Sequence, residues 1–143
     1  MVGGEEMIHY CLWCKKRVIM PFVDKHSVFC SGKCLANYLI SYPPQKVGRG
    51  FPLPPHFNFR SKWELNFAKK FCEAYKLKWK YEPYAFRLSN LKWYIPDFEV
   101  NGHFIEIKGI WEAGARKKAK MFRKEYGNLL ILDKLILKKV GVL

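Results

Sequence analysis

Residues 94–109 read Tyr-Ile-Pro-Asp-Phe-Glu-Val-Asn-Gly-His-Phe-Ile-Glu-Ile-Lys-Gly, a pattern that predicts a tight β-hairpin. The dipeptide Asn101-Gly102 lies between two apolar-rich runs, and both of its residues accept the positive φ of a type I′ turn. If the loop consists of these two residues, Val100 pairs with His103 and every later pair follows from that register. The sequence therefore predicts which side chains lie opposite one another along the two strands.

The same register brings three charged side chains together. Asp97 falls opposite Glu106, although directly opposed like charges destabilise a sheet, and Lys108 shares the face of Glu106 because it is two residues further along the strand. Both faces of the hairpin also carry apolar residues, so we expect both to be covered, and charges in such places are usually paired or bind metal. Two carboxylates beside a lysine therefore predict a site for a hard divalent cation. The alternative is a surface hairpin in which Lys108 only neutralises Glu106.

The hairpin lies inside a longer predicted α/β unit. We expect a helix at about 61–76, which starts with Ser61 as N-cap and Glu64 in a capping box. The other expected elements are a strand at 79–88 with a bend at Pro83, the hairpin at about 93–108, a helix at about 111–126 and a buried strand at 128–133. This α-β-β-β-α-β order predicts a right-handed crossover to a parallel last strand.

Each predicted helix has one apolar face that should meet a core. On the first helix the residues at helical spacing are Trp63, Phe67, Phe71 and Ala74, and on the second they are Trp111, Ala115, Ala119, Phe122 and Tyr126. Cys72, also on the first helix, is expected to be a core residue.

Composition indicates a basic folded chain with a polyanionic partner. Of the 143 residues, half are apolar and 17% are aromatic, which is enough for a core, and the formal net charge is +14. The positive excess is spread along the chain and favours a nucleic-acid partner, although ribosomal and other basic proteins share this property. No apolar run is long enough to span a membrane, and the acidic start lacks the layout of a signal peptide. We therefore expect a cytoplasmic, nucleic-acid-associated protein without a membrane partner.

Four of the five cysteines predict a structural zinc site. They form two short-spaced pairs, Cys11/Cys14 and Cys30/Cys34, and each pair lets one tight turn offer two thiolates to one ion. Ser31 is expected to cap a helix at about 32–41, with the last of these cysteines in its first turn. The alternative is two disulfides or free thiols, but disulfides are uncommon inside cells. His26 is an alternative ligand.

Residues 43–60 separate the cysteine-rich part from the α/β unit. Five of the eight prolines fall in this stretch, so we expect an extended linker without internal secondary structure. The chain then divides into a zinc finger at 1–42, a Pro/Gly-rich linker at 43–60 and an α/β domain at 61–143. We expect only weak contact between the two folded units.

The motifs in residues 61–135 resemble those of a nuclease superfamily. Pro96-Asp97 followed by Glu106-Ile107-Lys108 is similar to the motif of the PD-(D/E)xK nucleases, and the element order is similar to their common core. The surrounding sequence most resembles the phage junction-resolving, transposon end-cleaving and very-short-patch-repair-like endonucleases. Residues 29–34 and the helix after them resemble small MYM/TRASH-like zinc fingers. These resemblances imply a restriction-endonuclease-like core with a small N-terminal four-cysteine zinc finger.

The resemblance also implies Mg²⁺- or Mn²⁺-dependent hydrolysis of phosphodiester bonds. Asp97 and Glu106 would hold the catalytic ion, and Glu64 on the first helix would be an additional acidic residue. Lys108 would orient or deprotonate the attacking water, or stabilise the transition state. Glu64 has an alternative role within its own capping box, and Glu82 is expected to be a strand residue paired with a nearby lysine.

The second predicted helix carries a basic face. Its cationic residues are Arg116, Lys117, Lys120, Arg123 and Lys124, and three of them are spaced by four. Such a run is often only a solvated face. Because this helix follows shortly after Lys108, however, we expect contact with DNA phosphates, which positions the protein without reading sequence.

Together these patterns predict a Mg²⁺-dependent endodeoxyribonuclease whose zinc finger assists DNA binding or targeting. One alternative is a non-catalytic, zinc-containing nucleic-acid-binding adaptor, which the intact Asp97, Glu106 and Lys108 disfavour. Another is a zinc-containing ribosome-associated or RNA-processing protein, for which charge is the only support. Because one active site cuts one strand, cleavage of both strands would suggest a homodimer.

Overall fold

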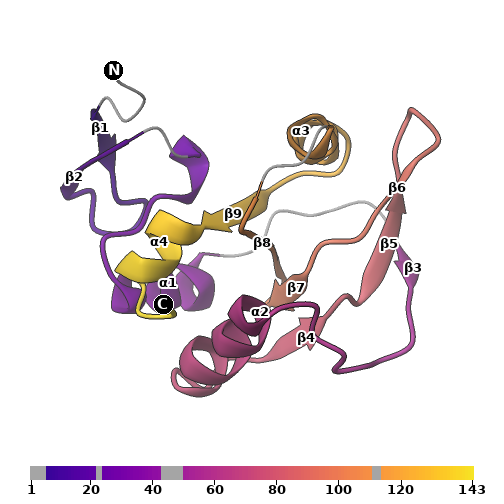
Figure 1. Cartoon of the computed structure of the whole chain (residues 1–143), viewed down its shortest axis with the longest axis horizontal. Helices are drawn as coiled ribbons and strands as arrows, with labels where there is room; N and C mark the ends of the chain where they lie inside the picture. Colours follow the sequence, from indigo (N-terminus) through magenta and orange to yellow (C-terminus); the bar gives the residue numbers. More distant parts are fainter. Residues whose placement is uncertain (1–5, 22–23, 43–49, 111–113) are drawn as a thin grey trace.

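The computed structural model describes residues 6–21, 24–42, 50–110 and 114–143 of the chain. Within these ranges the protein is a mixed α/β structure with sheets of two, three and four strands. The four-stranded sheet lies between the other two sheets (Figure 1). No helix in these ranges is long and apolar enough to cross a membrane.

The four-stranded sheet contains the predicted hairpin. Its strands are β4 (Trp79–Tyr81), β7 (Phe98–Val100), β8 (His103–Lys108) and β9 (Leu129–Asp133), and they lie side by side in that order. β4 pairs with β7 and β7 with β8 in antiparallel fashion, whereas β8 and β9 are parallel. The predicted parallel last strand is therefore confirmed.

The predicted turn and register of the hairpin are confirmed as well. Val100 pairs with His103 and Phe98 pairs with Ile105. Asn101 and Gly102 have φ values of 50° and 85°, both positive, as a type I′ turn requires. The charged residues expected to converge follow directly at the end of this ladder.

Both faces of the sheet are covered, as predicted. The helix α2 (Lys62–Asn66) continues into the π-helical segment η2 (Phe67–Glu73) on one side of the sheet, and α3 (Ala115–Glu125) lies on the other side (Figure 1). Along β8, Ile105 belongs to the cluster that contains the aromatic residues of η2, whereas Phe104 packs with Phe122 of α3. Side chains on either face of β8 are therefore withdrawn from water.

The helices differ from the prediction at their ends. Ser61 caps α2 as expected, because its hydroxyl accepts from the Glu64 backbone N–H at 3.2 Å. Cys72 is a core residue as predicted, but Ala74 is exposed. A π-helical turn contains more residues than an α-helical turn, so it rotates later residues off the predicted apolar face. The expected first turn of the second helix, 111–113, lies outside the described residues.

The predicted strand at 79–88 is in fact two strands in different sheets. β4 ends at Tyr81, and β5 (Tyr84–Arg87) joins β3 (Phe51–Pro52) and β6 (Trp93–Tyr94) in the three-stranded sheet. Glu82 makes the break with a φ of 45°, a left-handed conformation that non-glycine residues rarely adopt. The linker prediction is also wrong at 51–52, because β3 pairs with β5. Residues 43–49 of that linker lie outside the described residues.

The N-terminal unit consists of short elements. They are the hairpin of β1 (Met7–Tyr10) and β2 (Arg17–Met20), the 3₁₀ turn η1 (Lys25–Ser27) and the helix α1 (Gly32–Ser41). Ser31 caps α1 as predicted by accepting from the Cys34 N–H at 3.2 Å. The C-terminal helix α4 (Lys134–Lys139) was not predicted. A Cβ on Gly32 would lie 2.7 Å from the Val140 carbonyl oxygen, so this glycine permits close packing of α1 against the chain end.

The N-terminal unit packs tightly on the rest of the protein, which contradicts the expected weak contact. Its residues Phe29, Leu35 and Leu39 belong to the same hydrophobic cluster as Phe67 and Leu130. The hydroxyl of Ser27 accepts from the backbone N–H of Ile131 at 2.7 Å and so occupies a donor on the open edge of β9. The apolar positions responsible come from separate short elements, including α1 and β2, and their spacing does not show that they pack against η2 and β9.

An ion pair reinforces this contact. The guanidinium of Arg123 donates to both carboxylate oxygens of Asp24, at 2.9 and 2.5 Å, and also to the Leu129 carbonyl oxygen. Arg123 is therefore a tether between α3 and the N-terminal unit and does not belong to the exposed basic face that the sequence pattern predicted. Burial alone would raise the pKa of Asp24, but hydrogen bonds from Arg123 and Ser27 outweigh it and lower the pKa.

We expect Asp24→Asn to lower the free energy of unfolding by about 2 kcal/mol at pH 7, because a charge-assisted hydrogen-bond pair is lost. A carboxylate with a depressed folded-state pKa stabilises the fold above its unfolded pKa of about 3.9, and that stability is lost as the pH falls through the folded pKa. Urea unfolding of both proteins should therefore show a gap at pH 7 that closes at low pH. Glu73→Gln, in the exposed Lys69–Glu73 pair, is the matched control. A gap that is independent of pH would contradict this assignment.

Candidate functional site

Asp97 is fixed at the end of the hairpin by the backbone on both sides. Its Oδ2 accepts from the Ile107 N–H of β8 at 2.8 Å, and its own carbonyl oxygen accepts from the Glu82 N–H at 2.8 Å. The side chain is only 7% exposed. The carboxylate is thus held against β8, where the predicted register placed it.

Glu106 lies on the adjacent part of β8 and is equally buried. Its Oε2 pairs with Lys108 Nζ at 3.2 Å, so the predicted convergence of these two residues is confirmed. Its Oε1 is buried and makes no hydrogen bond of regular geometry within the described residues. The Tyr94 hydroxyl, which is likewise unsatisfied, interacts with Glu106 and lowers the pKa of its carboxyl group. A buried carboxylate oxygen without a donor costs free energy, so it requires a ligand or a proton.

Both carboxyl groups have a raised pKa. Burial raises the pKa of Asp97 well above its usual range, and the neighbouring charges of Glu106 and Glu64 raise it further, against the lowering effect of the Ile107 N–H. Burial also raises the pKa of Glu106, although Lys108 lowers it. Like charges that share a dry site disfavour ionisation, and a bound cation removes this penalty.

Glu64 bonds to the backbone at the start of α2 and still lies near Asp97. Its Oε1 accepts from the Arg60 N–H at 2.8 Å, one residue before the expected capping-box partner. The side chain is nevertheless buried, and its charge raises the pKa of Asp97. Capping the helix therefore does not direct this carboxylate away from the hairpin.

The carboxylates fit a sparsely liganded cation. In the described part of the chain, only the four cysteines bring three or more potential ligand atoms within 4.8 Å of one another, so Glu64, Asp97 and Glu106 do not form a closed cage. Mg²⁺ is commonly bound by one or two carboxylates and keeps several waters. The orphaned Oε1 of Glu106 beside Asp97 is consistent with such a pair of ligands.

A basic groove opens beside these residues. It has a volume of about 550 Å³, and Lys108 lies in its wall. Its cationic lining residues are Arg60, Lys92, Lys108, Lys117 and Lys118, and none of its described lining residues is acidic. Three of these residues, Arg60, Lys92 and Lys118, were not singled out from the sequence, because they come from separate segments and form no motif.

The predicted basic face of α3 is divided between two surfaces. Lys117 faces the groove of Lys108, whereas Arg116 and Lys120 line a second groove of about 720 Å³ together with Lys25 and His26 of the N-terminal unit. Lys124 is exposed further along the helix. The basic residues of α3 are therefore divided between two grooves, and Lys124 lies beyond the residues that line them.

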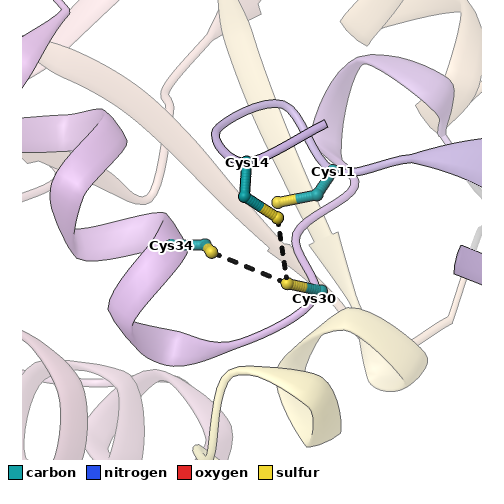
Figure 2. A group of neighbouring side chains, drawn as sticks. All are labelled: Cys11, Cys14, Cys30 and Cys34. Atoms are coloured by element: carbon teal, nitrogen blue, oxygen red, sulfur yellow. Dashed lines mark hydrogen bonds between the residues drawn. The ribbon is translucent and has the colours of Figure 1, made fainter. Parts of the chain in front are cut away.

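The four predicted zinc ligands come together. The sulfur of Cys30 lies 3.6 Å from those of Cys14 and Cys34, and all four sulfurs, including that of Cys11, lie within 4.8 Å of one another (Figure 2). Tetrahedral zinc with Zn–S bonds of about 2.3 Å would separate its sulfurs by roughly 3.8 Å. All five cysteines are free thiols, so the alternative of two disulfides is not observed.

His26 does not belong to this cluster and lines the second groove instead. The four thiols alone therefore fit one structural zinc ion.

Comparisons with known proteins give limited similarity. No family model matches the chain, and no solved structure matches it. The chain is similar to Endonuclease I of Escherichia phage T7, with 40% identity over 76 residues. The matched region covers 50% of this chain and 50% of the phage protein, so the chain spans about half the length of this curated relative.

Proposed function

We propose that the protein is a divalent-metal-dependent endonuclease that hydrolyses phosphodiester bonds in DNA. The observation that carries the proposal is the buried pair Asp97 and Glu106, with one carboxylate oxygen unpartnered among the described residues and Lys108 adjacent. The similarity to a phage Endonuclease I supports the same reaction class. The order α2-β4-β7-β8-α3-β9 is consistent with a restriction-endonuclease-like core of the PD-(D/E)xK type.

The chain's own residues would divide the work as follows. Asp97 and Glu106 bind the ion, with Glu64 close enough to add charge, and bound Mg²⁺ or Mn²⁺ supplies Lewis acidity and an activated water. Lys108, held by Glu106, donates to the attacking water or to the reacting phosphate. Phe104 and the other apolar residues of β8 keep bulk water away, which strengthens these charge interactions.

We further propose that the four-cysteine unit binds zinc and assists DNA binding. Lys25 and His26 of this unit line the same groove as Arg116 and Lys120 of α3. A duplex that contacts α3 would therefore also reach the N-terminal unit. Residues 1–42 and 61–143 remain two functional units in this proposal, although they share a core.

Nicking of supercoiled plasmid by the purified full-length protein tests the proposal. We expect nicked or linear product with Mg²⁺ or Mn²⁺ and none with EDTA. Binding of the plasmid without cleavage in either metal would reject the endonuclease and favour the alternative function, a zinc-containing adaptor that only binds nucleic acid.

The basic residues of α3 are expected to contact the phosphate backbone. Joint replacement of Arg116, Lys120 and Lys124 by glutamine should weaken binding to all duplexes equally, and each lost contact should flatten the slope of log K against log[salt] by about 0.9. Fluorescence anisotropy over a salt series measures this slope. Lys69→Gln, on the exposed side of η2, is a control for the loss of positive charge. A changed ranking of sequences at constant slope would instead indicate base recognition.

A further inference from the structure

A buried glutamate and an exposed arginine form a pair beside the candidate active site. Glu82 is only 5% exposed and lies in the left-handed region, with a φ of 45°. Burying a carboxylate and straining its backbone both cost free energy, so partners must compensate for them. The partners of this side chain are His56 and Arg60, whereas the sequence pattern predicted a lysine.

Arg60 supplies the positive charge of this network. Its Nη2 lies 2.8 Å from Glu82 Oε2, an ion pair without hydrogen-bond geometry, and His56 Nε2 lies 2.9 Å from Oε1. His56 Nδ1 accepts a hydrogen bond from the Asn58 N–H, so the ring proton of a neutral imidazole lies on Nε2. This Nε2–H then donates a hydrogen bond to Glu82. Arg60 is therefore the residue in this network that balances the carboxylate's charge.

The backbone N–H groups of the same two residues bond to Glu64 and Asp97, the two residues that carry the neighbouring carboxylates. The Arg60 N–H donates to Glu64, and the Glu82 N–H donates to the carbonyl oxygen of Asp97, each at 2.8 Å. The pair thus links the segment before α2 with the segment before β7. A shift of either residue would move a candidate metal-binding carboxylate.

The exposed side chain of Arg60 lines the basic groove that contains Lys108. This side chain is 68% exposed even though its partner is buried. Guanidinium has five N–H donors in a planar fork, and the ion pair engages one terminal nitrogen, which leaves the others for a ligand. The remaining charged lining of the groove is made of lysines, which bind phosphate as point charges without a fixed geometry.

We propose that Arg60 binds a phosphodiester group of the DNA strand in this groove and that Glu82 is its positioning residue. The inference rests on the proposed endonuclease function and adds a phosphate-binding residue to its active site. Glu82 fixes the guanidinium relative to Asp97 and Glu64, so the bound phosphate is placed beside the carboxylates. An exposed arginine without such a partner would lose this geometry to rotamer freedom.

Four variants of the full-length protein test the pair: Arg60→Gln, Arg60→Lys, Glu82→Gln and the double variant Arg60→Gln/Glu82→Gln. Each is compared with the wild type for duplex binding over a salt series in EDTA, for single-turnover cleavage at saturating enzyme in Mg²⁺, and for thermal unfolding. Lys69→Gln, which removes an exposed lysine from an ion pair outside the groove, is the matched control.

We expect Arg60→Gln, alone and in the double variant, to flatten the salt slope by about 0.9 and to lower the single-turnover rate roughly tenfold to a hundredfold. Arg60→Lys should keep the slope but not the rate, because the charge remains and the fork is lost. Glu82→Gln should also keep the salt slope and lower the rate, because Arg60 keeps its charge but loses its positioning partner. The double variant leaves no unpaired buried charge, so it should unfold near the wild-type temperature. Any loss of cleavage or binding by this variant then reflects a lost function and not a lost fold.

A folded double variant with wild-type slope and rate would overturn the proposal and leave the endonuclease function intact, because the wild type would still cleave. Full rescue of rate by Arg60→Lys would also overturn it, since charge alone would then suffice. If the wild type binds DNA but never cleaves, the proposed function fails, while the salt slope of Arg60→Gln still reports the phosphate contact.

Discussion

Asp97→Asn and Glu106→Gln are each expected to lower Mg²⁺-dependent cleavage roughly a thousandfold, because the loss of a metal-binding carboxylate removes several kcal/mol of transition-state stabilisation. Both substitutions keep the size of the side chain, and the amide oxygen introduced by Asp97→Asn can still accept from the Ile107 N–H that now donates to Asp97. Single-turnover cleavage of a labelled duplex at saturating enzyme measures the effect.

Binding should respond in the opposite direction. Removal of either carboxylate removes repulsion of the phosphate backbone, so we expect affinity for duplex DNA in EDTA to be unchanged or tighter. Glu99→Gln is the matched control, because Glu99 lies on β7 of the same hairpin and its carboxylate pairs with Lys80 of β4. Near-wild-type cleavage by either folded variant would reject the assigned metal site.

Loss of zinc is expected to have the second large effect. Structural zinc in small domains contributes about 10–16 kcal/mol of apparent binding free energy, and this energy stabilises the fold. Here the four-cysteine unit shares a hydrophobic cluster with η2 and β9. Cys34→Ser should therefore lose the metal and lower the midpoint of thermal unfolding of the whole chain by more than about 10 °C.

Elemental analysis together with calorimetry measures both quantities. The wild type should contain one zinc per chain, and Cys72→Ala, which removes a buried cysteine outside the cluster, should keep it. A wild-type protein that lacks zinc but unfolds at the same temperature as the zinc-bound protein would contradict the assignment. Residues 58–143 alone should be unstable, and normal folding and cleavage by this fragment would show that the shared core is dispensable.

The features predictable from the sequence depend on short-range rules. Asn101-Gly102 fixes the turn type, and a two-residue turn fixes the register, so the approach of Asp97 to Glu106 follows without knowledge of the rest of the chain. The two cysteine pairs are similarly local, because each lies within one turn. Helix caps at Ser31 and Ser61 also follow from neighbouring residues.

The helical pattern was less reliable where packing overrides propensity. The apolar spacing predicted an exposed cationic Arg123, but its guanidinium binds Asp24, 99 residues away in the chain. A regular helix was expected up to residue 76, but a π-helical segment replaces its second half. At Arg123 the competing interaction comes from a distant segment that no local window contains.

The sequence alone was sufficient for the hairpin, the parallel last strand and the four-cysteine cluster, because turn geometry, alternation and ligand spacing act between near neighbours. The shared core, the basic groove and the Arg60–Glu82 pair arise only in the folded chain. They join residues from segments that are far apart in the sequence, and their proximity depends on how the covered faces of β8 pack against α3, η2 and the N-terminal unit.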